Sequence, residues 1–165
     1  MSTSSSLSDG SSTRKIPSLP DGYILRSLEE NDFNNNLIPV LKTLTTVGDV
    51  TKEEFANLYS EWIANSHVYN PLVITNREGK VVASGMLIVE SKLIHKCGKV
   101  GHIEDIAVDL SEQGKKLGLI LIKNLVELAR LKNCYKVILD CDAKNTGFYE
   151  KCGFSQEGIE MGFRF

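Results

Sequence analysis

One stretch of the chain, residues 101–131, limits most strongly what the sequence can fold into. Its first part is an apolar segment typical of a β-strand, and it carries two adjacent carboxylates, Glu104 and Asp105. A short basic loop with glycines follows. Apolar side chains then recur at the spacing of one buried helical face, at Leu117, Ile120, Leu121, Leu125, Leu128 and Leu131. The stretch therefore predicts a strand, a loop and a helix.

The loop between this strand and this helix has the composition of an anion-binding turn. The first backbone N–H groups of a helix lack partners within the helix, and the helix dipole favours negative charge there. Two lysines add cations, but the loop matches neither the phosphate loop nor the dinucleotide-binding glycine pattern. Taken alone, it is equally compatible with a plain strand-to-helix connection. Its residues are Gln113, Gly114, Lys115, Lys116, Leu117 and Gly118.

The composition is that of an ordinary soluble protein. The length of 165 residues favours one domain, and a net charge of -2 gives no reason to expect nucleic acid as a partner. No apolar run approaches the ~20 residues of a membrane helix, so we expect no membrane association. No secretory signal is evident, and the four cysteines lack zinc or redox spacing. We therefore expect a cytoplasmic protein with reduced thiols and no metal.

The first 18 residues differ from the rest of the chain. They are rich in Ser and poor in large apolar side chains, so burial cannot offset the entropy lost on ordering them. We interpret residues 1–18 as a disordered tail and residues 19–165 as a single folded domain.

The remaining pattern alternates between strand and helix signals. Thr51 and Glu54 form a capping box before a helix that extends to residue 63. Residues 76–80 form a turn that joins two strands into a hairpin. We expect strands at 23–28, 71–75, 81–90, 99–109, 135–141 and 159–165, with 92–95 continuing the hairpin, and helices at 33–44, 51–63, 117–131 and 145–151. This order predicts an α/β fold with a mixed, mostly antiparallel central sheet flanked by helices.

The central stretch resembles the GNAT-type acyl-CoA acetyltransferases, in which a strand, a Gln/Arg-x-x-Gly-x-Gly/Ala loop and a helix hold the coenzyme A pyrophosphate. Gln113 and Gly118 match that pattern, whereas Lys116 replaces its first Gly. The segments GHIEDIAV, CYKVILDC and FYEKCGF are similar to the eukaryotic, especially fungal, glucosamine-6-phosphate N-acetyltransferase family, in which the loop also appears as Gln/Arg-Gly-x-x-Leu-Gly. LTTVG at 44–48 and Arg164 also fit, so the resemblance covers roughly residues 19–165.

The resemblance implies a reaction and a cofactor. The 2-amine of D-glucosamine 6-phosphate would attack the thioester of acetyl-CoA, giving N-acetyl-D-glucosamine 6-phosphate and coenzyme A for UDP-N-acetylglucosamine synthesis. The backbone near Ile106 would polarise the thioester carbonyl. Acetyl-CoA would contact residues 113–118 together with Ile106, Ala107, Val108, Asn145 and Tyr149.

Several carboxylates are candidates for the general base. Alternation along a regular strand sends Glu104 and Asp105 to opposite faces, so we do not expect them to act as a pair. Both can instead serve structural hydrogen bonds, and Asp140 can cap the turn that follows its strand. The resemblance implies that all three contact the amino sugar. The residues leave open whether Asp140 or Glu104 removes the proton from the amine.

Tyr149 is the candidate acid. A lone tyrosine usually belongs to the core with its hydroxyl satisfied. The resemblance instead implies that Tyr149 donates a proton to the sulfur of coenzyme A.

The phosphate of the sugar needs cations or N–H donors. Lys92, His95 and Arg164 are candidates, with Thr45 as a hydroxyl donor. The resemblance implies that these residues, with Leu93 and Ile94, line a substrate pocket shared with a second subunit of a homodimer. Two other functions stay open: acetylation of a protein or peptide amine by the same fold, and non-catalytic binding of acetyl-CoA.

Overall fold

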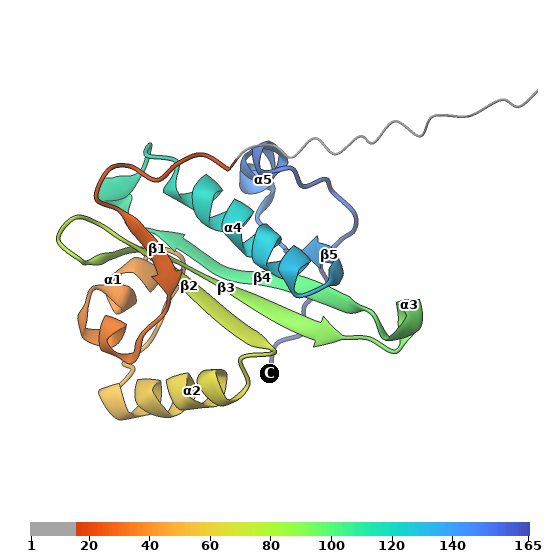
Figure 1. Ribbon diagram of the computed structural model, residues 1–165, viewed down its shortest axis with the longest axis horizontal. Helices are drawn as coiled ribbons and strands as arrows, with labels where there is room; N and C mark the ends of the chain where they lie inside the picture. The colour runs from red at the N-terminus through yellow and green to blue at the C-terminus, as the bar shows by residue number, and fades with distance from the viewer. Residues whose placement is uncertain (1–15) are drawn as a thin grey trace, which may run out of the picture.

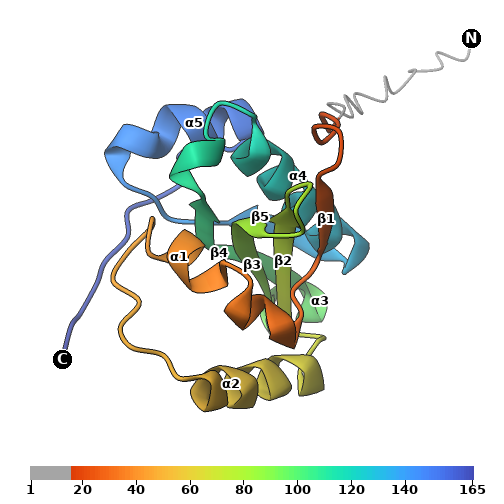
Figure 2. The ribbon, with the colours of Figure 1, turned by 90° about the vertical axis from the view of Figure 1, so that its left-hand side faces the viewer.

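The computed structural model describes residues 16–165 and places a five-stranded sheet between two layers of helices (Figures 1 and 2). Most of the predicted N-terminal tail, residues 1–15, lies outside the described residues. The strands are β1 (Ile24–Ser27), β2 (Tyr69–Thr75), β3 (Val81–Ser91), β4 (Lys99–Val108) and β5 (Cys134–Ile138). They lie side by side in chain order, antiparallel except for the parallel pair of β4 and β5. The predicted fold class is confirmed.

Each face of the sheet carries its own helices. Helices α4 (Leu117–Leu131) and α5 (Thr146–Cys152) cover one face, and α1 (Leu37–Leu41) and α2 (Lys52–Ala64) lie on the other (Figure 1). A separate hydrophobic core lies on each face of the sheet. Because side chains alternate along β2, Leu72 and Ile74 pack into the core on the α4 side, and Val73 packs into the core on the opposite side. Four of the six members of the predicted apolar stripe of α4 are buried, each contributing about 1.5–3 kcal/mol, whereas Leu128 is partly buried and Leu131, at the end of the helix, is 64% exposed. The four buried members are Leu117, Ile120, Leu121 and Leu125.

The sequence patterns predicted helix α2 and the hairpin of β2 and β3 correctly. The Thr51 hydroxyl accepts a hydrogen bond from the Glu54 N–H, and the Glu54 carboxylate accepts one from the Thr51 N–H, which is the predicted capping box. Gly79 adopts a left-handed φ of 78° in the turn between β2 and β3. The helix predicted at 33–44 is instead a 3-10 turn, η1 (Glu30–Asn34), followed by the short α1. Asn36 separates them with a positive φ of 71°.

Two predicted strand segments are wrong. Residues 92–95 do not extend β3: the Lys92 N–H binds the Gly98 carbonyl, and the chain turns through the short α3 (Ile94–Cys97) with left-handed backbone at His95. Residues 159–165 are not a strand, and Figure 2 shows the C-terminal segment running away from α5. Their alternation gives one apolar face, but a strand needs a neighbour for its backbone hydrogen bonds.

A buried ion pair joins β1 to η1. The Arg26 guanidinium binds both Asp32 carboxylate oxygens, at 2.7 and 2.8 Å, and the Glu29 N–H donates to the same carboxylate at 2.8 Å. Asp32 is 1% exposed. Burial alone would raise its pKa, but the hydrogen bonds from Arg26 and Glu29 outweigh burial and lower the pKa below its ordinary value.

Within residues 16–165, no helix has the combined length and hydropathy required to span a bilayer. The same residues contain no group of three His, Cys, Asp or Glu side chains arranged to hold a metal ion.

Candidate active site

The sheet opens between β4 and β5. The two strands pair only from Lys99 to His102 on β4, because β5 ends at Ile138 while β4 continues to Val108 (Figure 1). Beyond His102, the edge of β4 that faced β5 is no longer paired with it. A strand edge of this kind can hydrogen-bond an extended ligand as if it were another strand. The predicted cofactor contacts Ile106, Ala107 and Val108 all lie on this part of β4.

A bulge interrupts β4 beside this opening. Glu104 pairs with Met86 and Ala107 pairs with Ser84, so Asp105 and Ile106 together stand opposite the single residue Gly85. Asp105 adopts a left-handed φ of 54°. A Cβ atom on Gly85 would lie 2.5 Å from Ile106 Cδ1, so a larger residue at this position would displace the Ile106 side chain. The regular alternation assumed for Glu104 and Asp105 therefore does not apply.

Glu104 is held close to a second carboxylate. Its pKa is raised, first by partial burial, then by the charge of Asp140, and then by the charge of Asp105. Asp140 lies in the loop after β5, two residues beyond the end of that strand. Glu104 and Asp140 thus interact although they come from different strands. A raised pKa makes Glu104 a stronger proton acceptor than an ordinary carboxylate.

Tyr149 belongs to the same group. Its ring lies on α5 between those of Phe148 and Phe154, with centroids 5.1 and 6.2 Å away. Burial is the main cause of its raised pKa, followed by the nearby Cys141, Cys152 and Asp140. A phenol with a raised pKa remains protonated and can act as a proton donor. Asp140 therefore lies near both of the other predicted groups, Glu104 and Tyr149.

The predicted anion-binding loop lies at the start of α4. Gly114 and Lys116 have left-handed φ values of 85° and 62°, and no side chain caps the helix N-terminus. A left-handed residue followed by helical ones turns successive N–H groups to one side, which creates an anion-binding concavity. A Cβ on Gly118 would lie 3.3 Å from the Phe148 ring, so α4 approaches α5 closely here. Asn145 immediately precedes α5.

The structure does not bring the predicted phosphate contacts together: Lys92 and His95 lie at the turn between β3 and β4, and Thr45 lies near the opposite end of β4. Lys92 Nζ is 2.7 Å from one Glu90 carboxylate oxygen, and His102 Nε2 is 2.8 Å from the other. The pKa of Glu90 is lowered, first by Lys92 and then by His102. The His95 ring packs on the Tyr135 ring with centroids 4.3 Å apart. The neighbouring Leu93 and Ile94 are 88% and 61% exposed.

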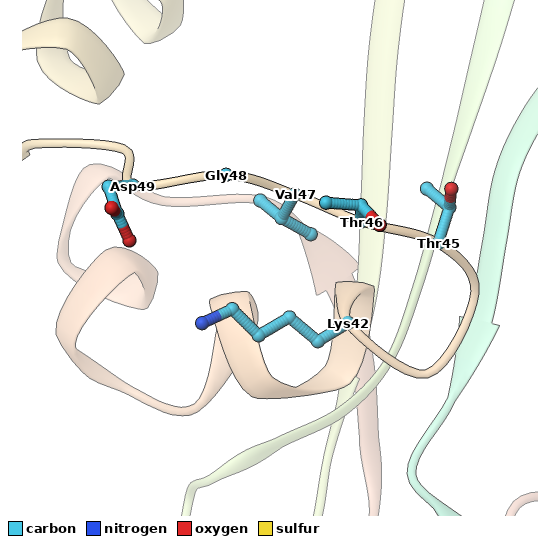
Figure 3. A pocket seen from close by; sticks show the side chains of 6 residues that line it. All are labelled: Lys42, Thr45, Thr46, Val47, Gly48 and Asp49. Carbon is cyan, nitrogen blue, oxygen red and sulfur yellow. The ribbon is translucent and has the colours of Figure 1, made fainter.

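Thr45 lines a shallow cavity between α1 and α2. Its volume is about 380 Å³, and Figure 3 shows the Lys42 side chain lying beneath the loop on the side of Asp49. The Thr43 hydroxyl binds the Val108 carbonyl at 3.3 Å, which anchors this loop near the end of β4. Arg164 lies apart from these groups, in the exposed C-terminal segment.

Sequence reasoning missed three contributions to the site. Gly85 permits the bulge, and a lone glycine within a strand pattern was the available signal. Cys141 lies near Tyr149, but no local pattern links a loop cysteine to a residue on the following helix. Glu112 binds both Lys115 and the distant Tyr23. Its i,i+3 spacing from Lys115 was a signal for the first contact only.

Comparison with known proteins shows the family of this chain. Residues 37–154 match the acetyltransferase (GNAT) family. The chain is 56% identical over 147 residues to a glucosamine 6-phosphate N-acetyltransferase of Candida albicans, covering 89% of this chain and 99% of that protein.

Solved structures of acetyltransferases are similar to this chain as well. The crystal structure of glucosamine-6-phosphate N-acetyltransferase from Arabidopsis thaliana has a TM-score of 0.84 and 40% identity, covering 87% of this chain and 98% of the other. A predicted acetyltransferase from Clostridium acetobutylicum, solved with acetyl-CoA, shares the fold with a TM-score of 0.68 at 15% identity, covering 86% of this chain and 96% of the other. This chain belongs to the acetyltransferase (GNAT) family and, within it, to the glucosamine 6-phosphate N-acetyltransferases.

Proposed function

We propose that the protein transfers the acetyl group of acetyl-CoA to the 2-amine of D-glucosamine 6-phosphate. The observation that carries this proposal is the unpaired edge of β4 beyond His102, with Glu104 on that strand and Asp140 near enough to raise the pKa of both Glu104 and Tyr149. An acyl transfer to an amine needs a base, a carbonyl polariser and an acid, and this arrangement offers all three. The function of the similar Candida albicans and Arabidopsis thaliana proteins agrees with it.

Acetyl-CoA fits the opening between β4 and β5. The amide groups of its pantetheine arm would pair with the edge formed by Ile106, Ala107 and Val108. Its pyrophosphate would bind the backbone N–H groups of residues 116–118 at the start of α4, with Gln113 and Lys116 beside it. Asn145 and Tyr149 would border the thioester end. No step of this reaction needs a metal.

The chemistry follows from the position of each group. An ammonium ion has no lone pair, so Glu104, or Asp140 in its place, first takes a proton from the sugar amine. The amine then attacks the thioester carbonyl, and a backbone N–H near Ile106 stabilises the oxyanion. The tetrahedral intermediate collapses by breaking its carbon–sulfur bond. Tyr149 supplies a proton to the departing thiolate, and coenzyme A leaves as a thiol. The nitrogen gives up its second proton, which restores the Tyr149 phenol through solvent, and the carboxylic acid releases the first proton to solvent.

The sugar would lie on the outer side of this opening. Asp105 and Thr45 would border it toward the Val108 end of β4, whereas Lys92 and His95 lie at the Lys99 end of the same strand. We therefore propose that Lys92 and His95 reach the phosphate from a second copy of the chain. Arg164 would complete the site from a second copy of the chain. A homodimer is supported by the large exposed side chains of the C-terminal segment, and a cytoplasmic location by the four free cysteines.

Release of free thiol from acetyl-CoA tests the proposal. The assay compares D-glucosamine 6-phosphate, unphosphorylated glucosamine and peptide amines as acceptors. We expect rapid release with the phosphorylated sugar and a much higher KM for glucosamine. Thiol release with peptides alone would identify a protein acetyltransferase. Binding of acetyl-CoA with no release from any acceptor would identify a non-catalytic module.

A further inference from the structure

Three polar side chains meet beneath the loop at the start of α4. The Tyr23 hydroxyl donates to Glu112 Oε2 at 2.7 Å. Lys115 Nζ donates to the same oxygen at 2.7 Å and to the Tyr23 hydroxyl at 2.8 Å. Tyr23 precedes β1, Glu112 ends the 3-10 turn η2 (Leu110–Glu112), and Lys115 lies in the loop. The contact therefore ties a segment some ninety residues away in sequence to the proposed pyrophosphate site.

Lys115 and Glu112 form an ion pair, and each is the charged partner of the other. The Glu112 side chain is only 12% exposed, whereas that of Lys115 is 43% exposed. The hydrogen bond from Lys115, and then that from Tyr23, lower the pKa of Glu112, and Glu112 is the main cause of the raised pKa of Lys115. If Lys115 turned away toward a phosphate, it would leave a carboxylate with little access to solvent.

Lys115 also occupies a special place in the loop. It stands between Gly114 and Lys116, both of which have left-handed backbone. For a residue with a side chain, such as Lys116, this conformation is unfavourable because the Cβ crowds the following carbonyl oxygen. A Cβ placed on Gly114 would meet open space, so packing does little to hold this part of the loop. The contacts of the Lys115 side chain supply the restraint that packing lacks.

We propose that Tyr23 and Glu112 are positioning residues for acetyl-CoA. They hold Lys115, and through it they keep the loop in the conformation that points the N–H groups of residues 116–118 at the pyrophosphate. In this arrangement Lys115 acts as a support for the loop and does not contact a phosphate directly. The inference rests on the proposed function, because it assumes that acetyl-CoA binds at this loop.

The experiment measures acetyl-CoA binding by calorimetry and steady-state kinetics with D-glucosamine 6-phosphate. The variants are Tyr23→Phe, Glu112→Gln and Lys115→Met, each in the full chain. Glu127→Gln is the matched control, because Glu127 forms the same i,i+3 pair with a basic residue, Arg130, away from the loop. Tyr59→Phe, on the opposite side of the sheet, controls for loss of a tyrosine hydroxyl. Thermal unfolding confirms that each variant is folded.

We expect Tyr23→Phe and Glu112→Gln to raise both Kd and KM for acetyl-CoA by about three- to tenfold, as expected for the loss of one or two net hydrogen bonds. Their kcat at saturating acetyl-CoA should stay within about twofold, since the chemical groups are untouched. Dephospho-coenzyme A, which keeps the pyrophosphate, should show the same fold-change. Lys115→Met should add nothing further in the Glu112→Gln background, because one contact is lost in either variant.

Two results would overturn the inference while leaving the proposed function intact. Unchanged binding in Tyr23→Phe and Glu112→Gln would show that the contact does not support the loop. Tighter binding in Glu112→Gln, reversed by adding Lys115→Met, would show that a released Lys115 binds a phosphate directly. Failure of the unmodified protein to bind acetyl-CoA would overturn the proposed function itself.

Discussion

At the scale of single residues, the site depends on two groups with displaced proton affinities. Burial and the charge of Asp140 raise the pKa of Glu104, and burial raises the pKa of Tyr149. These shifts suit opposite tasks, because the carboxylate accepts a proton more readily while the phenol remains protonated. Two titratable groups in one site, each adjusted in this way, are typical of an acid–base pair.

The role of Glu104 predicts a pH dependence. A base must be ionised to act, so kcat should fall on acidification with a midpoint above the ordinary glutamate value of 4.5. Glu104→Gln should remove this limb and lower kcat by about 100-fold or more. Asp140→Asn should move the limb to lower pH, because it removes a negative charge that raises the pKa of Glu104. If the limb survives in Glu104→Gln and vanishes in Asp140→Asn, Asp140 is the base.

Tyr149→Phe tests the acid. The change removes only a hydroxyl from a ring that packs between Phe148 and Phe154, so the fold should be preserved. We expect kcat to fall by roughly 100-fold, the usual contribution of a positioned acid, while Kd for acetyl-CoA changes by less than about twofold. Stopped-flow thiol detection and calorimetry measure the two quantities. An unaltered kcat would remove Tyr149 from the mechanism.

At the scale of secondary-structure elements, the bulge in β4 governs the site. It places two residues, Asp105 and Ile106, opposite Gly85, and it lies where β4 parts from β5. A bulge changes the direction of the side chains and the backbone groups on one strand without changing its neighbour. The edge proposed to bind the acetyl-CoA thioester therefore depends on a glycine in the adjacent strand.

Gly85→Val should disturb this geometry. The added side chain would meet Ile106, with Leu125 and Leu121 close behind, so we expect a loss of about 1–3 kcal/mol in the free energy of unfolding from overpacking. The KM for acetyl-CoA should rise at the same time, because Ile106 is displaced. Gly158→Val is the control, since a Cβ there meets nothing within 4 Å. Equal urea midpoints for the two variants would contradict this account of the bulge.

At the scale of the whole molecule, stability and assembly depend on contacts between distant parts. The ion pair of the partly exposed Arg26 and the buried Asp32 joins β1 to η1. Because the pKa of Asp32 is lower in the folded state than its ordinary value of 3.8, the carboxylate stabilises the fold above that pH. This contribution is lost as the pH falls through the folded-state pKa.

Acid unfolding tests the contribution of Asp32. Asp32→Asn leaves Arg26 with only its longer contact to Glu29 at 3.9 Å and should lower the free energy of unfolding at neutral pH by about 1.5–3 kcal/mol. The variant should also lose part of the steep decline in stability that the unmodified protein shows below pH 3.8. Urea titrations across this range measure both effects. Parallel pH profiles for the two proteins would show that protonation of Asp32 does not affect the free energy of unfolding.

The C-terminal segment tests the proposed dimer. Phe163 and Phe165 are 83% and 115% exposed, so replacing both with Ser should not weaken the fold of the single chain. We expect sedimentation to detect a dimer for the unmodified protein and a monomer for the double variant, with lower activity because Arg164 no longer reaches the neighbouring site. Ile63→Ser, at a 52% exposed position on α2, should remain dimeric. A monomeric unmodified protein would rule out this assembly.

The sequence by itself determined the parts that depend on near neighbours. The stripe of α4, the capping box at Thr51 and the turn at Gly79 are set by interactions within a few residues, so their patterns are readable along the chain. Glu104 and Asp140 could be picked out as candidate site residues in the same way, because each stands in or at the end of an apolar strand pattern. Their roles could be ranked only by resemblance, because a pattern does not report which groups lie close together.

The tertiary structure alone decided what distant segments do to one another. It placed Asp140, in the loop after β5, near both Glu104 on β4 and Tyr149 on α5, and it paired the bulge with Gly85. It also linked Tyr23 to Lys115 and left the C-terminal segment without a neighbouring strand. The physical reason is common to all of these. Burial, charge coupling and strand pairing depend on distances through space, which the order of residues does not specify.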